Sequence, residues 1–208
     1  MKNYNVTPIF YIPGTGGHFL SALLNCALIN NKEPMKFNEW GHMHDSGFGF
    51  NNQIKPFNVD SIKNRYKDKL VFISTHNPDI DFLLTHFNKM IVISYDKLDF
   101  LEIASALTMK TFYTKNREVE RIVKETNYNT VMMQIYMKQV VKTDNDNILY
   151  VSWANLYKED PTILIDSLTK FTGTLKENFN VDTINEWRKL TSKGIMELKN
   201  ICRNYSFI

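Results

Sequence analysis

The sequence predicts an α/β fold, a three-layer sandwich in which a mostly parallel central sheet has helices on both faces. Two observations lead to this prediction. Short apolar runs rich in β-branched and aromatic residues alternate with longer segments of helical periodicity. The first such run ends in a glycine cluster that opens directly into a helical pattern. Because helices that connect successive strands act as crossovers, the strands they join are expected to be parallel and buried on both faces.

Each expected element follows from its local pattern. The runs that read as buried strands cover residues 6–12, 70–75, 90–94 and 148–151. The first helix is expected to begin at about Gly17 and to be terminated by Asn30 and Asn31. Its apolar stripe consists of Phe19, Leu20, Leu23, Leu24, Ala27 and Leu28. Further helices are expected over residues 60–69, 79–87, 97–111, 117–125, 130–141 and 161–171.

The chain of 208 residues is predicted to be one domain, residues 1–208, because no linker divides it. Residues 33–59 show little periodicity and are expected to be a long loop or insert, which in a compact domain is usually functional. The C-terminal segment, residues 183–208, is expected to be helical, with the helix running from Thr183 to Cys202.

Composition limits the classes of function. The net charge of +3 suits an anionic small ligand and is far from the basic stripe of a nucleic-acid-binding protein. Only two cysteines occur, without a CxxC pair or zinc-binding spacing, as is typical of a reducing compartment. No apolar run reaches the length of a membrane span and no signal-peptide core is evident, so we expect a cytoplasmic protein that does not bind membranes.

The glycine cluster after the first strand is a candidate anion site. Gly14, Thr15, Gly16 and Gly17 stand where a strand passes into a helix, whose first backbone N–H groups lack intrahelical partners and face a ligand together with the positive end of the helix dipole. No lysine follows the glycines, so the loop departs from the nucleoside-triphosphatase pattern. The alternative interpretation is a tight turn in which glycine is needed only for packing.

His76 directly follows the second expected strand, so it should lie at the same sheet edge as the glycine loop. A neutral imidazole there can accept a proton from an acceptor hydroxyl. The alternative is a loop histidine that caps the next helix or faces solvent.

Several segments, in order, resemble the sulfotransferases that use 3′-phosphoadenosine 5′-phosphosulfate (PAPS). Residues Ile12 to Leu20 occupy the place of that family's Y-P-K-S-G-T-T-x-L loop, and Ser74 to Pro78 is similar to its K-T-H-L-P segment. Lys97 and Ser105 keep the spacing of the arginine and serine that bind the 3′-phosphate in the family. Residues 150–156 look like its last strand and the Y-E-D-L turn. The similarity extends over about residues 6 to 172.

The resemblance implies a fold like that of the P-loop-containing nucleotide hydrolases and an enzyme that transfers a sulfuryl group from PAPS to an acceptor hydroxyl or amine, without a metal. It implies that His76 is the catalytic base. The donor would be bound by Gly14, Thr15, Gly16, Gly17, His18, Lys97 and Ser105. The expected partners are this nucleotide donor and an acceptor that the sequence does not identify.

The chain departs from the family at three cations. Gly14 replaces the loop lysine, Ser74 replaces the lysine before the catalytic histidine, and Lys97 replaces the arginine. A cation from elsewhere would have to compensate, with His18, Lys55 or Lys110 as candidates. Two other interpretations stay open: a catalytically silent nucleotide-binding module, and a divergent P-loop kinase.

Two further clusters have competing interpretations. His42 and His44, with Asp45, are potential metal ligands, but no third ligand is evident, so these residues are expected to line an acceptor pocket or a partner surface instead. The helix expected over 130–141 contains three methionines and is expected to be core or a homodimer face.

Overall fold

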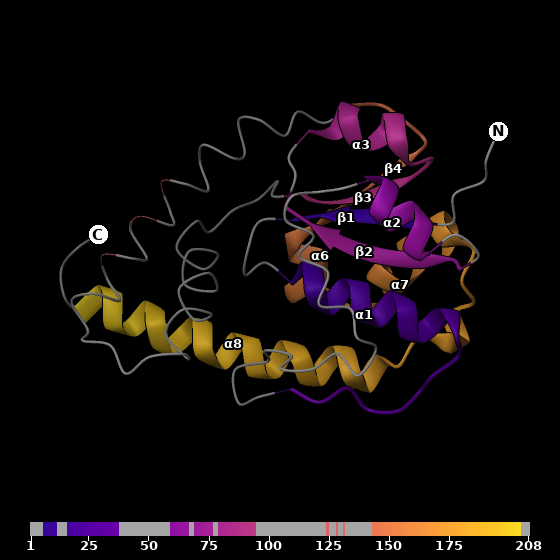
Figure 1. Cartoon of the computed structure of the whole chain (residues 1–208). Coiled ribbons are helices and arrows are strands. Elements are labelled where there is room, and N and C mark those ends of the chain that lie inside the picture. Colours follow the sequence, from indigo (N-terminus) through magenta and orange to yellow (C-terminus); the bar gives the residue numbers. More distant parts are fainter. Residues whose placement is uncertain are drawn as a thin grey trace.

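The central sheet has four parallel strands in the order β2-β1-β3-β4. The computed structural model describes residues 6–11, 16–37, 59–66, 69–76, 79–94, 124, 128, 131 and 143–204. The strands are β1 (Val6–Phe10), β2 (Val71–Thr75), β3 (Met90–Ser94) and β4 (Ile148–Ser152). Figure 1 shows them lying side by side between the helices. The predicted α/β class with a parallel sheet is confirmed for the part of the chain that the structure describes.

Strand register places the carboxyl ends of the strands at one edge. Phe10 of β1 pairs with Thr75 of β2, and Ser94 of β3 pairs with Ser152 of β4. All residues of β1, β2 and β3 are buried, which explains why these strands read as continuous apolar runs rather than as alternating ones.

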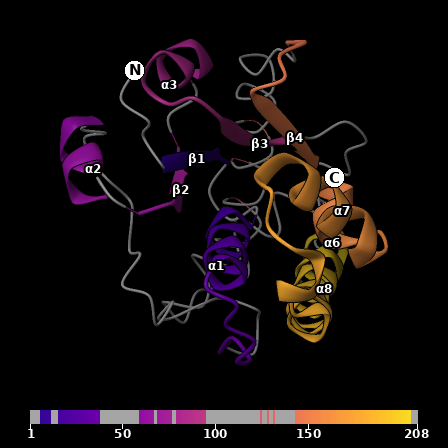
Figure 2. The same cartoon turned by 90° about the vertical axis from the view of Figure 1, so that its right-hand side faces the viewer.

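Helices cover both faces of this sheet, as predicted (Figure 2). On one face lie α1 (Gly17–Leu28), α6 (Trp153–Tyr157), α7 (Pro161–Thr172) and α8 (Val181–Asn204), packed on the alternate strand residues Ile9, Phe72, Ile91, Ile93 and Val151. On the other lie α2 (Val59–Arg65) and α3 (Ile80–His86), packed on the remaining ones, such as Phe10, Ile73 and Val92.

The bounds of α1, α3 and α7 agree closely with the sequence, those of α3 and α7 to within one residue at each end, whereas α2 ends at Arg65 and not at residue 69. Helix α6 was not predicted, because five residues are too few to show a helical period; the Ser152 hydroxyl accepts a hydrogen bond from Ala154 N and begins it. The one-turn 3-10 helix η1 (Lys176–Asn178) was also missed. Helix α8 begins at Val181, two residues early, and the side chain of Asn180 accepts from Thr183 N in its first turn.

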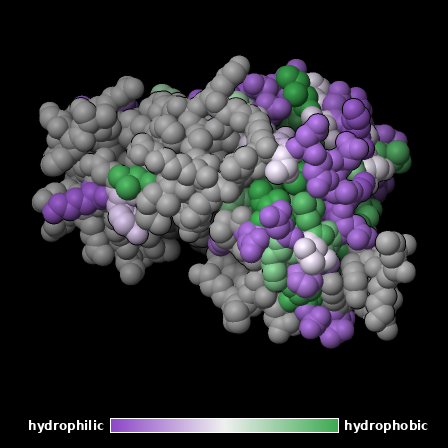
Figure 3. Space-filling model, turned by 90° about the horizontal axis from the view of Figure 1, so that it is seen from above, coloured by the Kyte–Doolittle hydropathy of each residue, from purple (hydrophilic) through white to green (hydrophobic). Residues whose placement is uncertain are grey.

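Part of the expected organisation lies outside the described residues. This holds for most of the long segment 33–59, for the helix expected over 97–111, and for most of those over 117–125 and 130–141. None of the helices among the described residues combines the length and the apolar character needed to cross a membrane. On the face seen in Figure 3, the described residues are largely hydrophilic, with hydrophobic ones between them.

Candidate functional site

The carboxyl edge of the sheet brings the ends of distant segments together. In the strand order, β2 lies on one side of β1, and β3 and β4 lie on the other. The strand that follows β1 in sequence is therefore placed towards one edge of the sheet, and the strand that follows β3 towards the opposite edge. In open α/β sheets, ligands bind outside the carboxyl ends of the strands at such a switch point. This edge is therefore where a binding site is expected.

Helix α1 begins at this edge without a side-chain cap. Gly16 is its N-cap residue, with a left-handed φ of 89°, and its carbonyl accepts from Leu20 N at 2.9 Å. The first turn contains no acidic residue. Its first N–H groups and the positive end of the helix dipole are thus suited to an anion.

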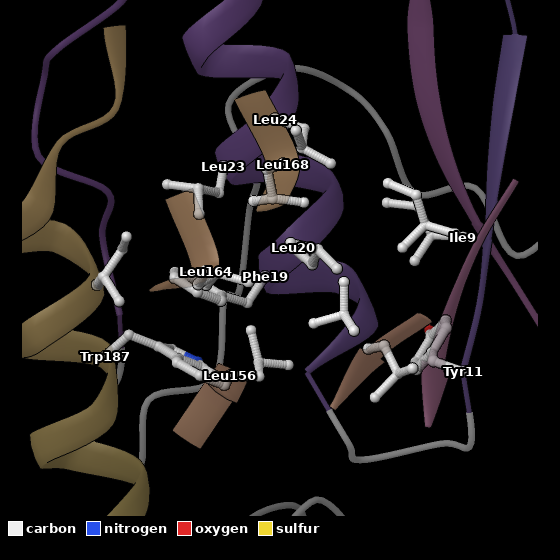
Figure 4. Packing of buried hydrophobic residues seen from close by; sticks show 14 of the residues in the cluster. Ile9, Tyr11, Phe19, Leu20, Leu23, Leu24, Leu156, Leu164, Leu168 and Trp187 are labelled. Carbon is white, nitrogen blue, oxygen red and sulfur yellow. The ribbon is translucent and has the colours of Figure 1, made fainter. Parts of the chain in front are cut away.

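The two described glycines of the loop are closely packed against core residues, of which Figure 4 shows Tyr11, Leu156 and Trp187. A Cβ atom on Gly17 would lie 2.1 Å from Cγ of Tyr11. A Cβ atom on Gly16 would lie 2.8 Å from Leu156 Cδ2 and 3.0 Å from Trp187 Cη2. Packing alone therefore accounts for the absence of a side chain at Gly16 and Gly17, as the alternative interpretation of the loop proposed.

His76 is held by the end of the neighbouring strand. Its Nδ1 lies 2.9 Å from the backbone oxygen of Tyr11, and the two rings lie 4.3 Å apart between centroids. Because a carbonyl oxygen can only accept, Nδ1 carries the hydrogen, and the neutral imidazole has its lone pair on Nε2. His76 does not cap the next helix, since the Asp79 side chain accepts from Phe82 N and caps α3.

His18, in the first turn of α1, also contacts Tyr11. Its Nδ1 lies 3.1 Å from the hydroxyl of Ser74, and its ring meets the Tyr11 ring edge-on with centroids 5.4 Å apart. Ser74 is buried, while both imidazoles are half-buried. Tyr11 thus contacts two histidines, one from α1 and one from the end of β2.

The structure brings together Gly16, Gly17, His18 and His76 among the predicted site residues. The other predicted donor-binding residues, Gly14, Thr15, Lys97 and Ser105, lie outside the described residues. So do the alternative cations Lys55 and Lys110 and the potential metal ligands His42, His44 and Asp45.

Two residues of this site were not assigned a role from the sequence. The sequence places Tyr11 inside the first strand, whereas the observed strand ends at Phe10, and its position near the end of that run was the available signal. Ser74 was noted only as a departure from a family pattern, and its pairing with His18 depends on how α1 packs on β2.

Within the described part of the chain, no group of three or more histidine, cysteine and acidic residues gathers as a metal site would require. Comparison of the chain with protein-family models, with curated proteins and with solved structures found no match.

Proposed function

We propose that this protein is a sulfotransferase-like enzyme with a P-loop-like nucleotide site, which transfers a sulfuryl group from PAPS to an acceptor hydroxyl or amine. The observation that carries the proposal is the hydrogen bond from His76 Nδ1 to the backbone oxygen of Tyr11. It gives a histidine a fixed tautomer at the carboxyl edge of the sheet, beside the start of α1, where an anionic donor would bind.

The described residues fit an anionic donor. Gly16, the N-cap residue of α1, provides no side-chain cap, and the first turn has no acidic residue to repel a phosphosulfate. At the carboxyl end of β3, the hydroxyl of Ser94 is buried and has no hydrogen-bond partner among the described residues. A buried polar atom without a partner is uncommon in a native protein and is consistent with a ligand at this edge. In this proposal Gly14, Thr15, Lys97 and Ser105 complete the donor site.

The residues of the site would act on the acceptor as follows. The acceptor oxygen or nitrogen forms a bond to sulfur while the bond from sulfur to the bridging oxygen of the donor breaks, and adenosine 3′,5′-bisphosphate leaves. His76 Nε2 takes the proton from the acceptor, and the Tyr11 carbonyl keeps the ring oriented before and after this transfer. The N–H groups at the start of α1 stabilise charge on the transferring group.

One observation favours the second candidate, a catalytically silent nucleotide-binding module. The contacts of Gly16 and Gly17 with Leu156, Trp187 and Tyr11 explain both glycines without any ligand. Together with glycine and serine where the family has lysines, this is what a protein that lost the transfer chemistry would retain. A divergent kinase is the third candidate, distinguished by binding of ATP with Mg²⁺.

Calorimetric titration with adenosine 3′,5′-bisphosphate tests the donor assignment, with ATP and Mg²⁺ as the comparison ligand. We expect micromolar binding of the bisphosphate, weakened at least about tenfold by Lys97→Ala, since a cation that contacts phosphate contributes one charge-assisted interaction. Lys170→Ala is the matched control, because Lys170 is an exposed lysine in the last turn of α7. Absence of bisphosphate binding would overturn the proposal, and binding without turnover of any acceptor would favour the silent module.

A further inference from the structure

The two histidines of the site are held by partners of different chemistry. Nδ1 of His76 faces a carbonyl oxygen, which only accepts, so its hydrogen is fixed. Nδ1 of His18 faces the hydroxyl of Ser74, which both donates and accepts. When His18 is neutral, the hydroxyl can donate to Nδ1; when His18 is protonated, Nδ1 can donate to the hydroxyl oxygen. The Ser74 contact therefore holds the His18 ring in both charge states.

We propose that His18 is the titrating cation of this site, positioned by Ser74, and that it gains its proton when a dianionic sulfuryl or phosphoryl group binds at the start of α1. The inference rests on the proposed function and adds a residue pair to it. His18 and Ser74 together take the place of a permanently charged lysine, while His76 stays the neutral base.

The surroundings of His18 explain why protonation and binding are linked. An imidazolium in the first turn of a helix is disfavoured by the helix dipole. The His18 ring packs edge-on against Tyr11, from the end of β1, and a tyrosine is uncharged at neutral pH. The first turn of α1 has no acidic residue. A bound dianion makes protonation of His18 favourable, and protonation of His18 in turn raises the affinity for the dianion.

The two histidines are expected to work in opposite protonation states. His76 must be neutral to accept a proton from the acceptor, whereas His18 must be charged to neutralise the transferring group. The Tyr11 ring lies against both imidazoles, with centroid distances of 4.3 Å to His76 and 5.4 Å to His18. The rate should therefore pass through a maximum in pH, while affinity for the anion should rise steadily as pH falls.

The test is the pH dependence of anion binding between about pH 6 and about pH 8, where imidazole titrates. Inorganic sulfate is the main probe because its charge is constant over this range, whereas phosphate groups titrate near pH 6. Adenosine 3′,5′-bisphosphate is the second probe. For the wild-type protein we expect sulfate affinity to rise by up to about tenfold for each unit that the pH falls, as for the uptake of one proton.

Variants separate this role from a structural one. His18→Gln should abolish the pH dependence, and His18→Lys should hold affinity near its low-pH level throughout, because lysine stays charged. Ser74→Ala should weaken binding at low pH by roughly threefold to tenfold, as expected for loss of one hydrogen bond, and Ser74→Thr, which keeps the hydroxyl, should restore it. His86→Gln is the control, since His86 lies in the last turn of α3, away from the carboxyl edge.

NMR titration of the imidazole signals gives a readout independent of turnover. The signal that disappears in His18→Gln should titrate at higher pH when sulfate is bound. If His18→Gln leaves the pH dependence of sulfate affinity unchanged, the inference is wrong whatever the donor. If sulfate shows the expected dependence but the bisphosphate does not bind, the proposed donor is wrong and the His18–Ser74 pair stands. If neither anion binds, both proposals are overturned.

Discussion

Gly17 lies directly against the ring of Tyr11, so closely that a Cβ atom would come within 2.1 Å of Cγ and 2.2 Å of Cδ1. Tyr11 is 2% exposed and belongs to the same core cluster as Phe19 and Leu20 of α1. This contact fixes the start of α1 against the end of β1. It therefore determines where the first N–H groups of the helix lie relative to His18 and His76.

Gly17→Ala should destabilise the protein, although alanine is normally favoured over glycine in a helix by about 1 kcal/mol. Cγ of Tyr11 is close to the backbone and cannot move aside cheaply, so we expect a loss of about 1–3 kcal/mol from overpacking. Chemical denaturation measures it. Gly173→Ala is the comparison: nothing lies within 4 Å of a Cβ there, but its φ of 76° is unfavourable for alanine. A neutral or stabilising Gly17→Ala would show that the ring can shift.

The side-chain amide of Asn25 joins α1 to the outer strand β2. It makes hydrogen bonds to the backbone of β2 that a neighbouring strand would otherwise make. Its Nδ2 donates to the carbonyl of Phe72 at 2.8 Å, and its Oδ1 accepts from Phe72 N at 3.0 Å. The Ser21 hydroxyl also donates to the Phe72 carbonyl, at 2.8 Å. Side chains of α1 thus satisfy both backbone groups of a residue at the end of the described strand order.

Asn25→Asp should be more damaging than Asn25→Ala at neutral pH. The alanine variant leaves buried backbone groups without partners, at a cost of about 1–3 kcal/mol. The aspartate variant adds a buried charge facing a carbonyl oxygen, and its pKa should be raised by burial. A raised pKa in the folded state means that stability is lost as pH rises, so the difference between the variants should shrink towards about pH 4. Thermal unfolding of the two variants at neutral pH and at about pH 4 measures this difference. Equal stabilities of the two variants at neutral pH would contradict the pairing of Asn25 with Phe72.

Cys26 should be inert in the folded protein. Burial raises the pKa of its thiol from 9.0 to about 11, so almost no thiolate exists at neutral pH. In a Cys202→Ser background, a thiol reagent at about pH 8 should react only after denaturant is added. Because the folded pKa lies above the unfolded one, stability from this group is present below pH 9.0 and is lost as pH rises towards about 11. Fast labelling of the native protein would show that this part of α1 opens.

Arg188 of α8 holds the C-terminal end of α6. Its Nε donates to the Leu156 carbonyl at 2.9 Å, and its other nitrogens donate to the carbonyls of Asn155 and Glu159. Burial lowers the pKa of the guanidinium, opposed by the negative charges of Asp160 and Glu159. Lysine has no fork of donors that could reach three carbonyls.

Arg188→Lys should therefore lower the free energy of unfolding by about 1.5–3 kcal/mol, the range for hydrogen bonds to a charged group. Leu156 also packs closely against Gly16, the N-cap residue of α1. The start of α1 should therefore lose order when Arg188 no longer holds α6. Denaturant unfolding and hydrogen exchange at the first turn of α1 measure the two effects. Lys189→Ala, next to it on α8 and exposed, is the control. Unchanged stability in Arg188→Lys would mean that water replaces the lost contacts.

The elements of the sheet were predictable because each is a local pattern. Strands such as Met90–Ser94 are continuous apolar runs, and the apolar stripe of Gly17–Leu28 has a helical period. The side-chain pairs that form the site could not be predicted from the sequence. His18 meets Ser74 across 56 residues and His76 meets Tyr11 across 65, so both contacts depend on how α1 and β2 pack on β1. A motif can indicate which edge of the sheet carries function, but not which hydrogen bond fixes a tautomer.

Replacement of His76 is the sharpest test of the proposed chemistry. His76→Ala should lower kcat by about 10²- to 10⁴-fold, the usual contribution of a general base. Binding of adenosine 3′,5′-bisphosphate should stay within about twofold of the wild type, because the proton transfer belongs to the transition state. In the wild type, the rate should rise with pH on the acid side of its maximum, as Nε2 loses its proton. Single-turnover rates and calorimetry separate the two quantities, with His86→Ala as the control. If His76→Ala lowers bisphosphate binding as much as it lowers the rate, His76 helps to hold the donor. If the rate is unchanged, another residue is the general base.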